Sequence, residues 1–370
     1  MKTVLLVFGT RPEAIKMAPV IRGLRQRPDH FRPIVAVTGQ HREMLDQVLA
    51  VFDIVPDADL DLMQHGQRPE AVLAGAVTGI AEFVREQRPD ALLVQGDTTT
   101  TLAGALAGFY ENVTVGHVEA GLRSDNKRAP FPEEVNRRLT TDAADLHFAP
   151  TEHARMRLLS EGVSSADVWV TGNTVVDAVL EAAGLPYAFD DEDLDSLAHG
   201  AARFLLVTAH RRESWGEPLE QICLGIRDVV DDFDDLRAVF PVHRNPTVRS
   251  TVNRVLGGHP RVLLTEPLDY LPFVKLMAAA TLVLSDSGGV QEEAPSLNTP
   301  VLVLRATTER PEALEAGAVS LAGVERAGIA AAARDLLVDP VKYREMAEAT
   351  NPFGDGTASE QIIDILQERL

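Results

Sequence analysis

The sequence has a single cysteine, few aromatic residues and no apolar segment long enough to cross a membrane. Cys223 is the one cysteine among 370 residues, and aromatic residues make up 5%. A lone cysteine excludes an intrachain disulfide and suits a reducing compartment; Cys223 is expected to be a small buried apolar residue. No apolar stretch approaches the roughly 20 residues of a membrane helix, and the apolar run before Gly9 is too short for a signal peptide. We therefore expect a cytoplasmic protein that does not associate with membranes.

Basic residues are scarce relative to acidic ones. The chain has 35 Lys and Arg against 55 Asp and Glu, which gives a net charge of −20. This balance opposes general binding to nucleic acid or anionic lipid, which requires a basic surface. Zinc-ligand spacing is also missing from the pattern of cysteines and histidines. Asp286 could hold magnesium, but arginines already supply positive charge, so we expect no metal and no other cofactor.

Short β-branched runs alternate with helical patterns along the whole chain, and hydrophobic residues make up 45%. Continuous apolar strands between helices are typical of parallel sheets covered on both faces. The predicted strands are Val4–Phe8, Ile34–Thr38, Ala91–Gln95, Val113–Val118, Leu146–Ala149 and Val168–Thr171, then Phe204–Thr208, Arg237–Val242, Val262–Thr265, Leu282–Ser285, Val301–Leu304 and Val319–Leu321. The acidic segment Gly184–Gly200 between the two sets is predicted to be a surface connection. The fold class is therefore α/β, with two doubly wound Rossmann-like domains that face each other across a cleft.

The first predicted strand ends in a turn suited to an anion. Gly9 permits a tight turn, Pro12 fits the first turn of a helix, and Arg11 and Lys16 lie beside that helix N-terminus. The turn carries one glycine, so it matches neither the dinucleotide fingerprint nor the Walker loop. Arg11 or Lys16 alone could be an ordinary surface residue, but the presence of both at one strand-to-helix turn favours an anion-binding site.

Carboxylates follow the next strands of the first half. Asp97 comes after Ala91–Gln95, Glu119 follows Val113–Val118, and Glu133 opens a helix after two prolines. Asp97 alone could cap a helix, and Glu133 alone could complement a helix dipole. Neither alternative explains why carboxylates recur at strand ends that meet at one edge of a sheet. Their recurrence favours acid–base chemistry.

The strand ends of the second half carry phosphate-binding residue types. His210 can bind a phosphate or transfer a proton, and the two glycines after Ser287 allow backbone N–H groups to approach a phosphate. Glu293 could accept hydrogen bonds from ribose hydroxyls. The cationic or phosphate-binding candidates of both halves are Arg11, Lys16, Arg123, His210, Arg211, Ser287 and Arg310. Together they indicate an anionic ligand, a nucleoside diphosphate held mainly by the second half, with the carboxylates facing the group that it carries.

Eight segments in order, from residue 3 to about residue 355, resemble one family. They are Gly-Thr-Arg-Pro-Glu-Ala-Ile-Lys, Gly-Gln-His-Arg-Glu-Met, Gln-Gly-Asp-Thr-Thr-Thr-Thr, His-Val-Glu-Ala-Gly-Leu-Arg, Pro-Glu-Glu-x-Asn-Arg, Ala-His-Arg-Arg-Glu, Asp-Ser-Gly-Gly-x-Gln-Glu-Glu and Thr-Glu-Arg-Pro-Glu. The ordered set is similar to the non-hydrolysing UDP-N-acetylglucosamine 2-epimerases. This resemblance implies a fold like that of GT-B glycosyltransferases, a homodimer, no NAD, and interconversion of UDP-N-acetylglucosamine and UDP-N-acetylmannosamine for cell-surface polysaccharide precursors. In that family UDP is eliminated to give a 2-acetamidoglucal and is then added back.

The resemblance also implies roles for single residues. The UDP-binding positions are Arg11, His210, Ser287, Gly288, Gly289, Glu293 and Arg310, and the catalytic positions are Lys16, Asp97, Glu119, Glu133 and His210. A second, activating UDP-N-acetylglucosamine site matches Gln40, Glu43, Gly66, Glu133, Arg211 and His243, where Glu43 and Gly66 replace the Gln and Arg of other members. Many members of the family resemble Arg-Arg-Glu-Asn at this point, whereas this chain has Ser214-Trp215-Gly216 after Arg-Arg-Glu. We expect this difference to have little consequence.

The same resemblance assigns domains. Residues 1–172 and 355–370 form the domain with the catalytic carboxylates, residues 173–354 form the UDP-binding domain, and the C-terminal helix crosses back to the first. Three other functions stay open for such a site: a GT-B glycosyltransferase with a UDP-sugar donor, a hydrolysing epimerase, and a nucleotide-sugar-binding regulator without catalysis. The sequence also leaves open which carboxylate serves which face of the sugar.

Overall fold

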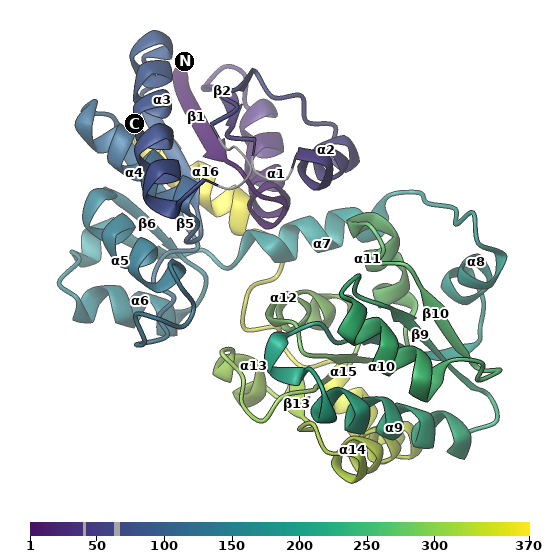
Figure 1. Cartoon of the computed structure of the whole chain (residues 1–370). Coiled ribbons are helices and arrows are strands. Elements are labelled where there is room, and N and C mark those ends of the chain that lie inside the picture. The colour runs from purple at the N-terminus through teal and green to yellow at the C-terminus, as the bar shows by residue number, and fades with distance from the viewer. Residues whose placement is uncertain (40–41, 63–66) are drawn as a thin grey trace. The chain divides into compact units, whose positions relative to one another are not determined.

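The computed structural model describes residues 1–39, 42–62 and 67–370, which fold as two α/β units (Figure 1). Unit 1 contains Met1–Ala178 and Phe353–Leu370, and unit 2 contains Val179–Pro352. The sequence placed the divisions after residue 172 and before residue 355. The structure moves the first division to residue 178 because Asn173 and Asp177 make their contacts within unit 1.

Unit 1 is built on a seven-stranded sheet with the order β3-β2-β1-β4-β5-β6-β7, in which every pairing is parallel. The order reverses between β1 and β4, and open parallel sheets bind ligands at such a point. The strands are β1 (Lys2–Phe8), β2 (Phe31–Val37), β3 (Ala58–Asp59), β4 (Ala91–Gln95), β5 (Thr114–Val118), β6 (Leu146–Ala149) and β7 (Val168–Val170). The helices are α1 (Arg11–Arg25), α2 (Arg42–Val51), α3 (Pro69–Gln87), α4 (Thr99–Tyr110), α5 (Glu133–Ala143), α6 (Glu152–Ser160), α7 (Thr174–Gly184), which runs on into unit 2, and α16 (Ala358–Arg369).

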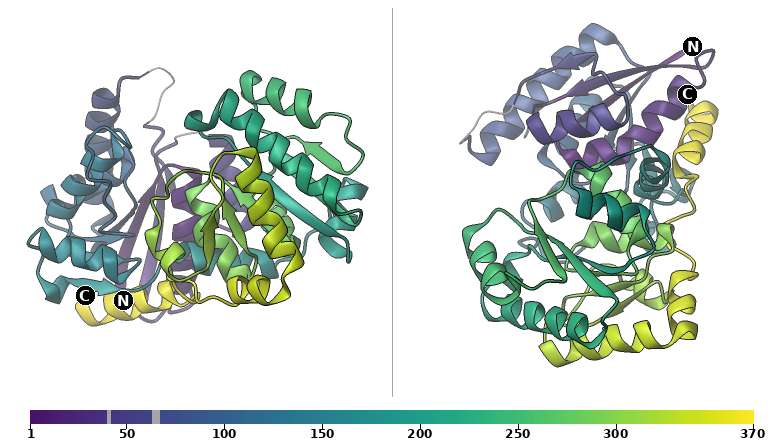
Figure 2. Two further views of the ribbon diagram at one scale, coloured as in Figure 1. Left: turned by 90° about the horizontal axis from the view of Figure 1, so that it is seen from below. Right: turned by 90° about the vertical axis from the view of Figure 1, so that its right-hand side faces the viewer.

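The C-terminal helix α16 packs on unit 1. Gly23 of α1 lies so close to it that an added Cβ would be 2.3 Å from Cδ1 of Ile363. The carboxylate of Asp177 accepts hydrogen bonds from the amides of Ala358 and Ser359 and from the Ser359 hydroxyl. The two chain termini consequently lie near one another on unit 1 in all views (Figures 1 and 2).

Unit 2 contains a six-stranded parallel sheet with the order β10-β9-β8-β11-β12-β13, which again reverses beside its first strand. The strands are β8 (Arg203–Thr208), β9 (Leu236–Pro241), β10 (Val262–Thr265), β11 (Leu282–Ser285), β12 (Val301–Val303) and β13 (Val319–Leu321). The helices are α8 (Glu192–His199), α9 (Glu217–Asp232), α10 (Pro246–Leu256), α11 (Tyr270–Ala279), α12 (Gly288–Glu293), α13 (Pro311–Glu315), α14 (Arg326–Val338) and α15 (Pro340–Ala347). Short 3₁₀ turns occupy Ser165–Asp167, Arg212–Ser214 and Ala294–Leu297.

The predicted fold class is confirmed, since each unit is a doubly wound parallel sheet with helices between its strands. All twelve predicted strands are present, with ends that shift by up to three residues. The two-residue strand β3 was missed because it is too short to show a pattern. The segment Gly184–Gly200 was wrongly treated as a connection alone: it contains helix α8, which Asp191 caps by accepting from the amides of Asp193 and Leu194.

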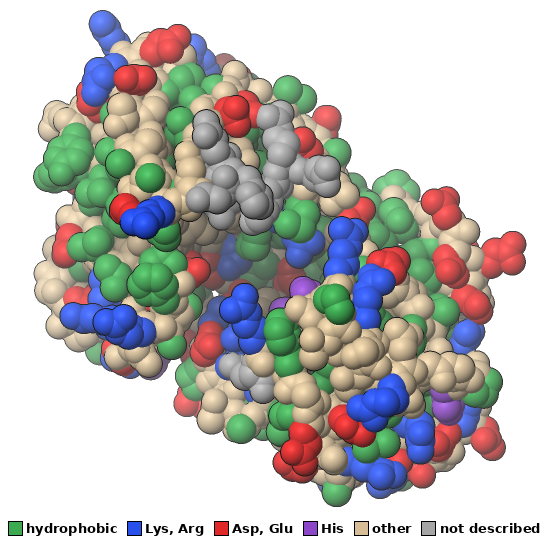
Figure 3. All heavy atoms as spheres, in the orientation of Figure 1, with side chains coloured by type: hydrophobic (Ala, Val, Ile, Leu, Met, Phe, Trp, Pro, Cys, Tyr) green, Lys and Arg blue, Asp and Glu red, His purple; other side chains and the backbone are tan. Residues whose placement is uncertain are grey.

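The central strands supply the cores of the two units. Val4–Phe8 of β1 and Phe204–Val207 of β8 are completely buried, as expected for strands covered by helices on both faces. Acidic and basic side chains are interspersed on the face shown in Figure 3. No helix in the described part of the chain is long and apolar enough to cross a membrane.

Candidate active site

The turn between β1 and α1 is fixed by a buried carboxylate. An added Cβ on Gly9 would lie 2.1 Å from Oγ1 of Thr38, so this close approach requires glycine. Glu13 accepts from the amides of Gly9 and Thr10 at 3.1 and 2.8 Å, and its other oxygen accepts from the Thr98 hydroxyl at 2.7 Å. Burial raises the pKa of Glu13, although these hydrogen bonds oppose the shift. Glu13 thereby joins the N-terminus of α1, which begins with the half-buried Arg11, to that of α4.

Glu119 lies at the centre of the polar network at the carboxyl end of β5. Nζ of Lys16 is 2.5 Å from its Oε1, and the side-chain amide of Asn173 donates to the same oxygen at 3.0 Å. The side-chain amide of Gln95 donates to Oε2. Glu119 itself has a φ of +64°, which is uncommon and unfavourable for a residue with a side chain. The predicted catalytic residues Lys16 and Glu119 are therefore in direct contact.

Asp97 is a half-buried residue that faces helix α5. Thr98, not Asp97, caps α4: its hydroxyl accepts from the amide of Thr101 at 3.1 Å. The carboxylate of Asp97 instead forms an ion pair with Arg137, and its carbonyl accepts from the side chain of Asn136 at 3.0 Å. The capping alternative for Asp97 is thus wrong.

Glu133 and Glu134 begin helix α5 but have different surroundings. Glu134 is fully buried and accepts from the Ser124 amide at 2.8 Å and from Arg138 at 2.9 Å. Burial alone would raise the pKa of Glu134, but these contacts outweigh burial and hold this pKa below its usual range. Oε2 of Glu133, in contrast, is buried and has no hydrogen-bond partner among the described residues. Glu134 is structural, while Glu133 retains an oxygen that can take part in chemistry.

Arg123 does not belong with the anion-binding candidates. Its side chain is fully buried and pairs with Glu161 through two contacts of 2.6 and 2.9 Å. It also donates to the hydroxyl of Thr141 at 3.0 Å. The guanidinium that the sequence placed at a ligand site is therefore occupied within unit 1.

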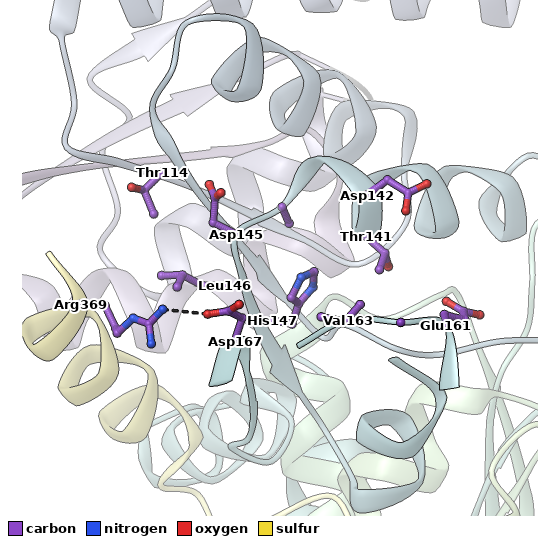
Figure 4. A pocket seen from close by; sticks show the side chains of 12 residues that line it. Thr114, Thr141, Asp142, Asp145, Leu146, His147, Glu161, Val163, Asp167 and Arg369 are labelled. Carbon is purple, nitrogen blue, oxygen red and sulfur yellow. Dashed lines mark hydrogen bonds and ion pairs between the residues drawn. The ribbon is translucent and has the colours of Figure 1, made fainter. Parts of the chain in front are cut away.

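A separate pocket of unit 1 lies at the amino ends of the strands, near the first residues of β5 and β6 (Figure 4). Asp167 and Arg369 form an ion pair of 2.8 Å at its border. The buried His147 also lines it, and burial lowers the pKa of this histidine to about 4. None of the predicted site residues lines this pocket.

In unit 2, the buried carboxylate of Asp286 holds the loop that follows β8. One oxygen accepts from the amides of His210 and Arg211, both at 2.9 Å, and the other lies 3.2 Å from Nδ1 of His210. The hydroxyl of Ser214 also approaches Asp286 at 3.4 Å, and the indole N–H of Trp215 donates to the carbonyl of His210 at 3.2 Å. The residues that depart from the family pattern thus support this loop directly.

Arginines gather at the N-terminus of α12. An added Cβ on Gly288 would have an Nη2 atom of Arg211 at 3.7 Å and one of Arg310 at 3.9 Å as neighbours. Arg310 pairs with the buried Glu292, and Arg211 lies 3.5 Å from Glu309. Burial alone would raise the pKa of Glu309, but the charges of Arg211, Arg305 and Arg310 outweigh burial and hold this pKa below its usual range. Two guanidinium groups, each with a carboxylate partner, therefore lie beside the backbone of Gly288.

Glu293 ends helix α12 and is largely buried beside α11. Burial raises the pKa of Tyr270 well above its usual value, and the nearby charge of Glu293 adds to the shift. The predicted ribose-binding carboxylate is therefore next to a protonated phenol.

Residues of the predicted activating site are described only in part. The ring of His243 stacks on that of His210, with centroids 6.3 Å apart, so His243 and Arg211 lie in the same region of unit 2. Gln40 and Gly66 lie outside the described residues. Glu43 belongs to helix α2.

Comparisons with known proteins identify the family. Residues 22–367 match the family model described as UDP-N-acetylglucosamine 2-epimerase. The chain belongs to this family. The UDP-N-acetylglucosamine 2-epimerase of Bacillus subtilis is 49% identical over 363 residues, which are 98% of this chain and 94% of that protein. That of Escherichia coli K12 is 48% identical over 377 residues, or 98% of each chain.

A solved structure supports the same assignment. The UDP-GlcNAc 2-epimerase of Neisseria meningitidis bound to UDP-GlcNAc superposes with a TM-score of 0.87 at 45% identity. The match covers 99% of this chain and all of that one. The resemblance found in the sequence is confirmed, and the chain is an enzyme of the epimerase type.

Several residues around the candidate site were missed by sequence analysis. Gln95 and Asn173 contact Glu119, Asn136 and Arg137 contact Asp97, and Glu13 joins two helix N-termini. Gln95, Asn136 and Arg137 stand inside the quoted family segments, so their position beside the carboxylates was a usable signal. Asn173 stands outside those segments, and only its place directly after a strand could have indicated it.

Proposed function

We propose that this enzyme interconverts UDP-N-acetylglucosamine and UDP-N-acetylmannosamine by reversible inversion at C2 of the sugar. The observation that carries the proposal is the contact of Lys16 with Glu119 beside the Gly96–Asp97 turn, where Asp97 pairs with a residue of α5, the helix that Glu133 begins. The family and the UDP-GlcNAc bound in the structure of the Neisseria relative supply the substrate class. The reaction would proceed through a 2-acetamidoglucal.

In the first half of the proposed reaction a carboxylate removes the C2 proton while the C1–O bond breaks. The electron pair of the C2–H bond forms the C1=C2 double bond, and the pair of the C1–O bond leaves with UDP. In the second half, a UDP oxygen adds to C1 and an acid delivers a proton to the other face of C2. At least two proton-transfer groups are therefore needed, and each contributes typically 10²–10⁴-fold.

The contacts of the three carboxylates favour different roles in this scheme. Oε1 of Glu119 is shared by Lys16 and Asn173, and Gln95 donates to Oε2. We infer that Glu119 chiefly holds Lys16 in an orientation suited to the sugar. Glu133 has a buried oxygen without a partner among the described residues, so it is the better candidate for direct proton transfer. Asp97 is our candidate for the opposite face of C2.

We further propose that unit 2 holds the nucleotide. His210, Arg310 and the backbone N–H groups of Ser287, Gly288 and Gly289 would bind the diphosphate, with Arg11 of unit 1 as an additional cation. Positive charge at these positions stabilises UDP as it departs, which lowers the barrier to elimination. Glu293 would accept from the ribose hydroxyls.

Three expectations from the family stay proposals. A second UDP-N-acetylglucosamine would activate the enzyme through Gln40, Glu43, Glu133, Arg211 and His243. The chain would form a homodimer, and it would act in the cytoplasm on precursors of cell-surface polysaccharide.

Product analysis tests the proposed function. The protein is incubated with UDP-N-acetylglucosamine, and the mixture is followed by proton NMR. We expect reversible formation of UDP-N-acetylmannosamine until a constant ratio is reached from either side. Release of free N-acetylmannosamine would indicate a hydrolysing enzyme, and transfer of the sugar to an added acceptor would indicate a glycosyltransferase.

A further inference from the structure

Asn173 stands between β7 and α7, at the point where unit 1 leads into the helix that enters unit 2. The residue is 2% exposed. The preceding residue, Gly172, has a φ of +86°, and an added Cβ there would lie 3.1 Å from the carbonyl oxygen of Phe353. The backbone amide of Asn173 donates to that same carbonyl at 2.7 Å. The position of Asn173 is therefore fixed by the segment through which the chain returns from unit 2 to unit 1.

The orientation of the Asn173 side chain follows from its partners. Oδ1 accepts from the backbone amide of Val175 at 3.2 Å, which caps the first turn of α7. An amide N–H can only donate, so the carboxamide oxygen must face Val175 and the NH₂ group must face the other way. That NH₂ group donates to Oε1 of Glu119 at 3.0 Å.

From this geometry we infer that Asn173 is a positioning residue that holds the Glu119 carboxylate against Lys16. Oε1 of Glu119 receives both the ammonium of Lys16 and the amide of Asn173. The amide adds no charge, so it orients the carboxylate without competing with Lys16 for it. Because Asn173 is also bonded to Phe353, the orientation of Glu119 is linked to the return segment of the chain. The inference rests on the proposed function, since it assigns Glu119 and Lys16 to the reaction.

Two substitutions separate this role from capping. Asn173→Asp keeps an oxygen for the amide of Val175 but sets a carboxylate against Glu119, where like charges raise the pKa of one member of the pair. Asn173→Ser keeps a capping hydroxyl and is too short to reach Glu119. Asn253→Asp, on the exposed face of α10 in unit 2, is the matched control for the change in charge.

The measurement is kcat and KM for UDP-N-acetylglucosamine as a function of pH, together with Tm. We expect Asn173→Asp to lower kcat by about tenfold or more at neutral pH and to move its acid limb upward by about one pH unit, with KM changed less than about threefold. Asn173→Ser should lower kcat with a smaller movement of the limb, and Asn253→Asp should match the wild type.

Three results would overturn the inference. They are a wild-type kcat in Asn173→Asp, an equal loss at every pH without movement of the acid limb, and failure of both Asn173 variants to fold, which would show that the contact with Glu119 serves folding, since both variants keep an oxygen for the cap. An inactive wild-type protein would instead contradict the proposed function, so the two failures are distinguishable.

Discussion

The carboxyl ends of the two sheets fix their functional groups in different ways. In unit 1 the side chains themselves are held: Lys16, Gln95 and Asn173 surround the carboxylate of Glu119. In unit 2 a buried carboxylate, Asp286, holds the backbone of the loop that carries His210 and presents its side chains. Holding the side chains themselves, as in unit 1, suits groups that must be positioned accurately against one reacting carbon atom. Holding the backbone of a loop, as in unit 2, suits a loop that binds a larger anion. Substitutions in unit 1 should accordingly change turnover, whereas those in unit 2 should change affinity.

The largest effect is expected for the carboxylates of unit 1. Asp97→Asn, Glu119→Gln and Glu133→Gln should each lower kcat by roughly 10²-fold or more, because each removes a proton-transfer group or the partner of Lys16. Steady-state rates measured by product NMR at saturating substrate test this. A near-normal kcat in one variant would remove that residue from the catalytic set.

A smaller effect, on KM more than on kcat, is expected for Arg310 of unit 2. Arg310 forms an ion pair with the buried Glu292, so the variant tested is the double substitution Arg310→Met with Glu292→Gln, which removes both charges of that pair. Loss of a charge-assisted contact to phosphate costs about 1.5–3 kcal/mol, which corresponds to a KM raised by roughly 10- to 100-fold. Arg326→Met is the matched control, since Arg326 pairs with Asp228 on the surface of the same unit. A change in kcat without a change in KM would contradict the expectation that substitutions in unit 2 change affinity and those in unit 1 change turnover.

A third prediction concerns His117, whose imidazole contacts the turn beside Asp97 and is expected to stay neutral in the folded protein. Burial lowers the pKa of His117 to about 3, and its Nε2 lies 2.7 Å from the carbonyl of Gly96, so Nε2–H donates. The unfolded chain therefore binds a proton between pH 6.5 and 3 that the folded protein excludes, and stability falls as the pH is lowered through this window.

His117→Gln keeps a donor for Gly96 but cannot titrate. It should reduce the slope of the unfolding free energy against pH by about 1.4 kcal/mol per pH unit between pH 6 and 5. Urea unfolding at a series of pH values measures the slope, and His153→Gln, at a histidine outside the core, serves as the control. An unchanged slope in His117→Gln would show that the histidine is not kept neutral by folding.

The smallest effect is expected for the single cysteine, which lies on helix α9 in the hydrophobic core of unit 2. Cys223 is fully buried, and burial raises the pKa of its thiol to about 12. Iodoacetamide at pH 8 should leave the native enzyme unmodified and active, because thiolate is the reactive form. Rapid alkylation of the folded protein with loss of activity would contradict this.

The fold was largely predictable because buried parallel strands read as continuous apolar runs. Val4–Phe8 and Leu282–Ser285 are examples that the structure reproduces within two residues. The two-residue strand β3 is too short to show a pattern. Helix α8 was missed because its apolar signal is only the buried pair Leu194 and Leu197 within an acidic segment.

The site was predictable at the level of residue type and not at the level of contacts. Arg123 looked equivalent to Arg310 in the sequence. The structure shows that both pair with a glutamate, but the Arg123 side chain is fully buried against Glu161, whereas that of Arg310 keeps some exposure. Asp97 looked like a helix cap because the cap is the next residue, Thr98. Asn173 reaches Glu119 across 54 residues of sequence, a separation that no local pattern reveals.

Exchange with solvent at C2 tests the central claim most directly. Turnover of UDP-N-acetylglucosamine in D₂O is followed by proton NMR and mass spectrometry. We expect deuterium at C2 of both sugar nucleotides, because the carboxylates of unit 1 are proposed to remove the C2 proton and to return one drawn from solvent. Epimerisation with the original proton retained at C2 would contradict it.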